Sequence, residues 1–222
     1  MKQVYLLIIL TLASCTVVGK QPSVLEDSNC NAPCWNGITV GITTEEEMLA
    51  ILRDLPVVDQ NIAVLNAWQI FDGGLNFYLY PNGLYKHNVV VESNFIHGKV
   101  ADIGFCGDPG VSFDDVVKEV GEPKNILILG SPSGGSFIVA INEEIGVQFM
   151  YDTANIPSQL RTKIAPEIPI KCLTYFAPEF YGEMLEAGLI TLGQLNAEQT
   201  LNVMRPWAGY GNLDEKYPPR QP

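Results

Sequence analysis

The sequence predicts an α+β fold of two tandem units, each a short helix followed by an antiparallel meander sheet, with a C-terminal helical segment after them. Three observations support this prediction. Apolar residues make up 47% of the 222 residues, which is enough to form a packed core. A helix-capping pattern occurs twice, after Gly41 and after Gly110. Short apolar runs separated by turn residues follow each copy of the pattern.

Each copy of the capping pattern predicts a short amphipathic helix. Thr43 with Glu46 and Ser112 with Asp115 have the spacing of a capping box, in which a hydroxyl and an acidic side chain pair with free amides at the helix start. Apolar residues then recur at helical intervals. They are Met48, Leu49, Ile51, Leu52 and Leu55 in the first helix and Phe113, Val116, Val117 and Val120 in the second. The residues expected to end the helices are Pro56, Gly121 and Pro123.

The strands expected after each helix define the two units, residues 30–107 and 108–177. Turn residues such as Pro81-Asn82-Gly83 separate them. The expected strands are 67–71, 75–80, 87–93 and 99–105 in the first unit and 126–129, 137–141, 147–151 and 170–176 in the second. The glycine-rich stretch 130–136 precedes a strand rather than a helix, which favours a hairpin loop over a phosphate-binding loop.

The C-terminal segment, residues 178–216, predicts two further short helices. The first ends at Gly188, and Asn196 with Gln199 gives the second a capping box. These helices could open a degenerate third unit or cover the sheet, and we expect the cover. Residues 217–222 contain three prolines and are expected to form a disordered tail.

The N-terminus has the features of an export signal. Residues 4–12 form an apolar stretch that is too short to span a bilayer as a helix. It ends in Leu12-Ala13-Ser14-Cys15, which resembles the bacterial lipobox. The resemblance implies that residues 1–14 are a signal peptide cleaved before Cys15, and that lipid chains on this cysteine anchor the protein in the membrane. The alternative is an ordinary secretory signal in which the cysteine is incidental.

The expected location is the extracytoplasmic side of a bacterial cell envelope. Thr16 rather than Asp follows the cysteine, which by the sorting rule of lipoproteins implies the outer membrane if the source has two membranes. Residues 15–29 show no apolar period and are expected to be a tether between the membrane and the folded part.

The remaining four cysteines predict disulfides. An even number of cysteines in an exported chain is typical of paired thiols, and Cys30, Cys34, Cys106 and Cys172 allow three pairings. The favoured pairing is Cys30–Cys34 with Cys106–Cys172, because Pro33 bends the short loop of the first pair. Zinc binding is disfavoured, since no second closely spaced pair is present.

Charge and composition argue against several functions. The net charge is −12 and no basic run occurs, so binding to nucleic acid is not expected. The only histidines, His87 and His97, lack an accompanying nucleophile motif. We therefore predict no catalytic residues, no metal site and no cofactor.

One strand offers a candidate binding surface. Strict alternation from 75 to 80 places Leu75, Phe77 and Leu79 on one side of the strand and Tyr78 and Tyr80 on the other. The apolar side should pack against the helix. The two tyrosines would then face outward, where tyrosine is favoured at binding interfaces, unless the C-terminal helices cover them.

The repeated arrangement resembles a known design. A turn, a capped helix and following strands are similar to small lipoproteins of the outer-membrane assembly type (SmpA/OmlA), and tandem copies resemble the β-lactamase inhibitor protein. The residues that carry the resemblance are Gly41, Thr43, Pro56, Gly110, Ser112, Gly121 and Pro123. The run Pro33-Cys34-Trp35-x-Gly37-Ile38 is similar to uncharacterised bacterial lipoproteins. We expect a lipid-anchored binding or scaffolding module with an envelope protein as partner; the alternative is an envelope-associated hydrolase.

Overall fold

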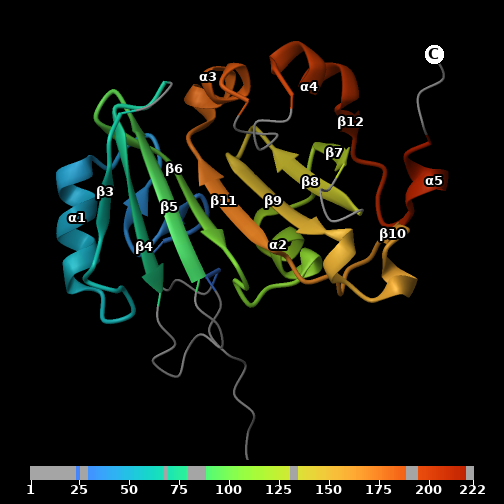
Figure 1. Ribbon diagram of the computed structural model, residues 1–222, viewed down its shortest axis with the longest axis horizontal. Coiled ribbons are helices and arrows are strands. Elements are labelled where there is room, and N and C mark those ends of the chain that lie inside the picture. Colours follow the sequence, from blue (N-terminus) through green and yellow to red (C-terminus); the bar gives the residue numbers. More distant parts are fainter. Residues whose placement is uncertain are drawn as a thin grey trace, which may run out of the picture.

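A computed structural model describes residues 24–25, 30–67, 70–79, 89–130, 135–188 and 195–218 of the chain. Its frame is a nine-stranded antiparallel sheet in the order β12-β7-β8-β9-β11-β6-β5-β4-β3 (Figure 1). The strands are β3 (Ala63–Leu65), β4 (Gly73–Leu79), β5 (Val89–Ile96), β6 (Lys99–Cys106), β7 (Asn125–Gly130), β8 (Ser136–Asn142), β9 (Val147–Asp152), β11 (Cys172–Phe176) and β12 (Arg205–Pro206). Two short antiparallel pairs lie outside it, β1 (Cys34–Trp35) with β2 (Ile38–Thr39) and β10 (Lys163–Ile164) with β13 (Gly211–Asn212).

Helices α1 (Glu45–Asp54) and α2 (Phe113–Val120) pack on one face of this sheet, which we call the helix face. The Ser93 hydroxyl of β5 lies 3.6 Å from Sδ of Met48 in α1. The ring of Phe113 in α2 meets Phe149 of β9 at a centroid distance of 4.8 Å. The opposite side is called the second face. The structure is thus an α+β fold, as the sequence predicts.

The strands are ordered outward from the centre of the sheet. β6 and β11 pair there, with Cys106 opposite Cys172. β5, β4 and β3 continue on one side, and β9, β8, β7 and β12 on the other. The residue before each helix cap is held by a similar hydrogen bond. The Thr43 carbonyl accepts from the Val100 amide of β6 at 2.8 Å, and the Val111 carbonyl accepts at 2.9 Å from the amide of Ile170, two residues before β11.

The predicted cap of α1 was wrong by one residue. Thr44 is the N-cap, and its hydroxyl accepts from the Glu47 amide while the Glu47 carboxylate accepts from the Thr44 amide. The Thr43 hydroxyl instead accepts from the Thr39 amide at 2.8 Å, in the turn that precedes the helix. The cap of α2 is confirmed, with Ser112 and Asp115 forming the capping box.

The predicted strand 67–71 was also wrong in its described residues, since 67, 70 and 71 lie in no named strand. The edge strand β3 lies earlier, and Phe71 is buried outside the named strands. Gly73 and Gly74, although glycine is a typical turn residue, begin β4. A Cβ atom at Gly74 would lie 2.7 Å from the Ser93 carbonyl oxygen, so glycine permits the close approach of β4 to β5. The other expected strands are present with small shifts at their ends.

The C-terminal segment forms the helices α3 (Tyr181–Glu186), α4 (Ala197–Val203) and α5 (Leu213–Lys216), and α3 and α4 lie along the upper rim of the second face in Figure 1. α4 contacts β7. Short 3-10 turns are η1 (Thr153–Asn155), η2 (Ser158–Leu160) and η3 (Pro178–Phe180). Within the described residues, no helix is both long and apolar enough to cross a bilayer.

The chain end is more ordered than the sequence predicts. Trp207 stacks on Phe113 of α2 at a centroid distance of 5.5 Å. Tyr217, which opens the tail expected to be disordered, is only 4% exposed, and its hydroxyl accepts from the Ala208 amide. The prediction was wrong at this residue because the Tyr217 ring packs near Trp207, which itself stacks on Phe113 of α2.

Both favoured disulfides are present. Cys30 pairs with Cys34, and Cys106 pairs with Cys172 across the two central strands. The second bridge therefore joins the two halves of the sheet covalently.

Candidate functional site

The second face carries the predicted binding strand, β4. Tyr78 is 44% exposed on this face, whereas its neighbours Phe77 and Leu79 are fully buried on the helix face. This is the alternation that the sequence predicts, and it is not the burial that a covering tail would give. Tyr80, the second candidate, and Cys15, the predicted lipid attachment site, lie outside the described residues.

The strand register places a line of polar residues beside Tyr78. Asn76 of β4 lies opposite Glu92 of β5, which lies opposite Gly104 of β6. Gly104 lies opposite Thr174 of β11, which lies opposite Gln148 of β9. These five residues, called the polar row below, cross five adjacent strands on the second face.

The side chains of the polar row are partly buried and lack partners. Glu92 is exposed, Asn76 and Thr174 are half-buried, and Gln148 is only 8% exposed. Within the described part of the chain, none of these four side chains forms a hydrogen bond. Their polar atoms reach solvent, because the buried side-chain atoms without a partner in the described part of the chain belong to Asn94, Glu143 and Trp207 instead.

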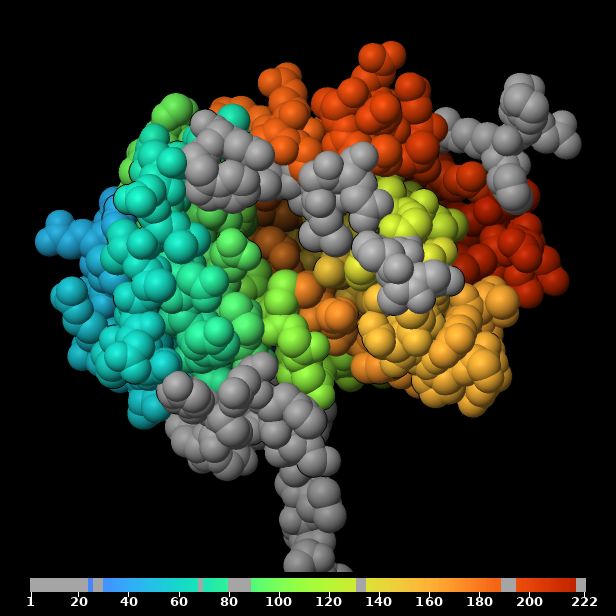
Figure 2. Space-filling view, viewed as in Figure 1, coloured from blue at the N-terminus to red at the C-terminus, as the bar shows by residue number. Residues whose placement is uncertain are grey.

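The middle of the row is recessed. Gly104 has no side chain there, and a Cβ atom at this position would lie 3.2 Å from Oγ1 of Thr174. Figure 2 shows the surface hollowed over β11, between the green and teal of β4–β6 and the yellow of β8–β9. The row therefore crosses a shallow depression.

The two halves of the second face, β7–β8 and β4–β5, differ in the polarity and exposure of their side chains. On β7 and β8 most residues facing this side are apolar, and Leu127, Val139 and Ile141 are buried. On β4 and β5 they are Asn76, Tyr78 and neighbours that reach solvent. We call the β4–β6 half of this face the open half.

A buried acid–amide pair lies next to the polar row. Asp102 of β6 is 6% exposed, and burial raises the pKa of its carboxyl group to about 7. Nδ2 of Asn94 donates to both carboxylate oxygens, at 2.9 and 3.2 Å, while Oδ1 of Asn94 is buried without a partner. A hydrolase would need its carboxyl groups to reach a substrate bond, but the carboxyl group of Asp102 is buried.

A second hollow lies beyond the central disulfide. It has a volume of about 300 Å³ and is lined by Asp108, Asp152, Asn155, Lys171 and their neighbours. Asp152 there accepts from the Ala154 amide and from Nδ2 of Asn155, so both of its oxygens have protein partners. In the described part of the chain, no three His, Cys, Asp or Glu side chains gather as metal ligands.

Comparison with known proteins adds no relative: no family model, curated protein or solved structure matches this chain. The resemblance to assembly-type lipoproteins therefore stays a prediction.

Sequence reasoning found Tyr78 but missed most of the polar row. Its members come from strands far apart in the chain, and each is an ordinary surface residue in its own segment. The only signal in the sequence was the alternation of side chains along each strand, which indicates the face of the sheet on which a residue lies but not its neighbours on other strands. The pairing of β6 with β11, which places Gly104 beside Thr174, has no local signature.

Proposed function

We propose that this protein is a lipid-anchored, extracytoplasmic binding or scaffolding module, and that the open half of the second face is its binding surface. The run Leu12-Ala13-Ser14-Cys15 supports the anchor. Two disulfides among the described residues are consistent with an oxidising, extracytoplasmic location.

The observation that carries the binding proposal is the polar, solvent-reaching surface of the open half, where Asn76 and Glu92 lie beside the exposed Tyr78. Tyr78 can bury a large ring and still keep its hydroxyl hydrated, as residues at binding sites often do. The side chains of Asn76 and Glu92 could form hydrogen bonds with a ligand on this surface. The apolar half of the same face is already buried, so the open half is the part left for a ligand.

We also propose that the two halves of the sheet are structural repeats. Each half begins with a capped helix, and equivalent carbonyls, those of Thr43 and Val111, accept from the amides of Val100 and Ile170. The matched positions of Met48 with Val116 and of Leu52 with Val120 are buried in both helices. The segment 153–171 would then be an insertion that replaces the tight turn at His97.

Cell fractionation tests the anchor. Replacing Cys15 with Ser removes the thiol that would carry the lipid, so the variant is expected in the soluble extracytoplasmic fraction and the parent in the membrane fraction. Replacing Cys30 and Cys34 with Ala is the matched control, because it removes thiols but leaves the lipobox intact. An unmodified Cys15 in the mature native protein, detected by mass spectrometry, would refute the anchor.

A further inference from the structure

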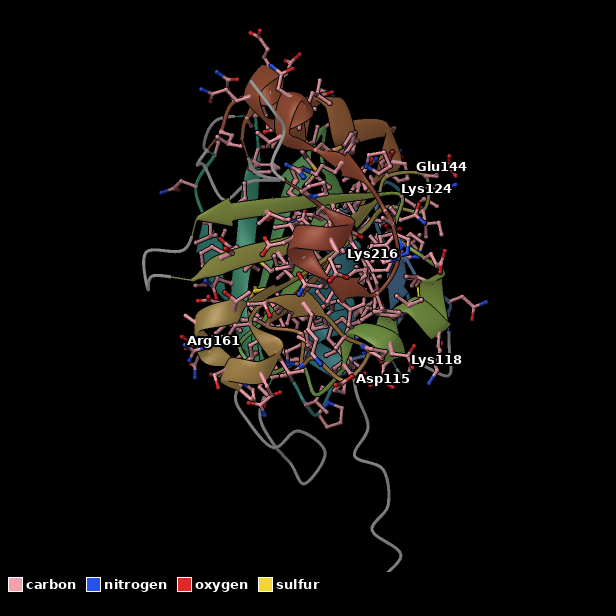
Figure 3. All side chains as sticks on the ribbon, turned by 90° about the vertical axis from the view of Figure 1, so that its right-hand side faces the viewer. Asp115, Lys118, Lys124, Glu144, Arg161 and Lys216 are labelled. Atoms are coloured by element: carbon pink, nitrogen blue, oxygen red, sulfur yellow. A yellow bond between two sulfur atoms is a disulfide. The ribbon has the colours of Figure 1, made fainter. Side chains whose placement is uncertain are left out.

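The nine-stranded sheet ends in two edge strands, β12 and β3, which differ in how they are protected. β12 is only two residues long and contains Pro206, whose nitrogen cannot donate to a further strand. Charges lie beside it, since Arg205 belongs to β12 and Lys124, just before β7, forms an ion pair with Glu144 at 3.2 Å. Figure 3 looks onto this side of the molecule and labels both residues of the pair. The β12 edge is therefore closed to a further strand.

The β3 edge lacks these protections. Ala63 and Val64 are exposed, Val64 to 66%, and neither proline nor a charged residue occurs in the strand. In Figure 1, β3 is the last strand of the sheet on the side of α1. Natural proteins usually protect edge strands with charge, proline or a covering segment, because an open edge pairs with other chains. An open, apolar edge therefore indicates a strand that receives a partner.

The backbone of β3 has hydrogen-bonding groups to offer. Leu65 lies opposite Gly74 of β4, and its carbonyl oxygen is directed at β4, since it would lie 3.1 Å from a Cβ atom at Gly73. Successive residues of a strand turn their amide and carbonyl groups to opposite sides. The amide and carbonyl of Val64 therefore point away from β4, where no strand of the described residues pairs with them.

The same edge adjoins the open half of the second face. Ala63 lies opposite Asn76, which lies opposite Glu92 on this face. A strand added at β3 would extend the face, so that its side chains continue the open half. Val64, on the other side of the strand, offers an exposed β-branched side chain for cross-strand packing.

We propose that β3 binds an extended segment of a partner protein, which adds to the sheet as a further strand. This inference rests on the binding function proposed above and names its partner class. In this mode of recognition, main-chain hydrogen bonds provide affinity and side chains on the sheet provide specificity. Val64 supplies the main-chain groups, and the open half supplies the neighbouring side chains.

A second copy of this chain is the less suitable occupant. Pairing β3 with β3 of another copy would join two strands of three residues, whereas stable protein interfaces use about 20–30 residues on each side. Each copy also carries a net charge of −12, so two copies repel each other. An extended segment can bind through its main chain alone and can carry the opposite charge.

The sequence around β3 indicates the chemistry of the segment. No charged residue occurs from 60 to 71, and Asp59 and Asp72 border this stretch. The cation nearest to it in the sequence is Arg53. A matching segment is therefore uncharged and rich in β-branched residues in its middle and basic at its ends.

Amide hydrogen exchange of the soluble Cys15→Ser chain, followed by NMR, tests the proposal. The probe is the blocked peptide Lys-Thr-Val-Thr-Val-Thr-Lys. In the free chain the Val64 amide should exchange fast and the Ala63 and Leu65 amides slowly, because only the latter two point at β4. The peptide should slow exchange at Val64. The same peptide with every inner backbone nitrogen methylated should not bind, and a version with Glu at both ends should bind more weakly.

A proline substitution tests the edge itself. Val64→Pro removes the outward amide but no hydrogen bond to β4, so the fold should persist while the peptide binds at least about fivefold more weakly. Glu198→Pro is the matched control, because it places proline at an exposed position in the first turn of α4, where proline is tolerated. It should bind the peptide as the parent does. Thermal melting reports whether each variant is folded, and the exchange of the parent chain tests the edge even if Val64→Pro does not fold.

Three results would overturn the proposal: no peptide binding at millimolar concentration, binding that Val64→Pro leaves unchanged, or a Val64 amide as protected in the free chain as that of Leu65. A concentration-dependent dimer that Val64→Pro abolishes, measured by sedimentation, would make a second copy the occupant instead. If the peptide does not bind but the chain still binds isolated envelopes through Tyr78, the edge proposal is wrong and the binding function survives. If neither binds, both are wrong.

Discussion

Asp102 is the residue whose chemistry departs furthest from that of an exposed side chain. Burial raises the pKa of its carboxyl group from 3.8 to about 7, and hydrogen bonds from Asn94 only partly oppose this. The folded protein therefore holds a proton on Asp102 at pH values where the unfolded chain has lost it. The stabilising contribution of this group is fully present below about pH 4 and is lost as the pH rises to about 7.

The first prediction concerns the Asp102→Asn variant. It should be more stable than the parent at about pH 8, by up to on the order of 4 kcal/mol, because the parent must bury an ionised carboxylate there. The new amide can also donate to the unpaired Oδ1 of Asn94. Urea unfolding between about pH 4 and pH 8 measures the effect, with the exposed Asp54→Asn as control. An identical pH dependence in variant and parent would contradict this assignment.

At the scale of elements, the helix starts show both the strength and the limit of sequence reasoning. Ser112 is a lone hydroxyl before α2, and its cap was predicted correctly. Before α1, two threonines precede three glutamates, so two overlapping registers have the spacing of a capping box. The Thr39 amide decides between them, because it binds the Thr43 hydroxyl and leaves Thr44 to cap the helix.

The second prediction follows from these caps. Thr44→Ala and Ser112→Ala should each lower the free energy of unfolding by about 0.5–2 kcal/mol, because each leaves a helix amide without its partner. Thr44→Ser keeps the hydroxyl and should be close to the parent. Denaturant titrations compare the three. If Thr44→Ala were as stable as Thr44→Ser, Thr44 would not be the cap.

At the scale of the whole molecule, the sheet is continuous through the pairing of β6 with β11. Alternation in the sequence predicted most strands, because each strand is amphipathic or buried within its own segment. It could not predict that residues 30–107 and 108–177 contribute to one sheet, since pairing between strands 66 residues apart at Cys106 and Cys172 depends on tertiary contacts. The polar row exists only because of that pairing, so the site was less predictable than the elements.

The third prediction compares the two disulfides. The Cys106–Cys172 bridge closes a loop with a sequence separation of 66, and the Cys30–Cys34 bridge one of 4. In the chain-entropy model, removing the long-loop bridge should cost about 4 kcal/mol and removing the short-loop bridge about 2 kcal/mol. Urea unfolding of the two Cys-to-Ala double variants measures both losses. A larger loss of unfolding free energy for the Cys30–Cys34 pair than for the Cys106–Cys172 pair would contradict the chain-entropy explanation for the central bridge.

The central claim is that the open half of the second face binds a component of the envelope. Its most direct test is co-sedimentation of the soluble Cys15→Ser chain with isolated native envelopes. Adding Tyr78→Ala should lower the bound fraction severalfold and leave the melting temperature nearly unchanged, because Tyr78 is 44% exposed. Adding Leu201→Ala, at an exposed apolar position of α4, should change neither. A bound fraction that Tyr78→Ala leaves unchanged would contradict the claim.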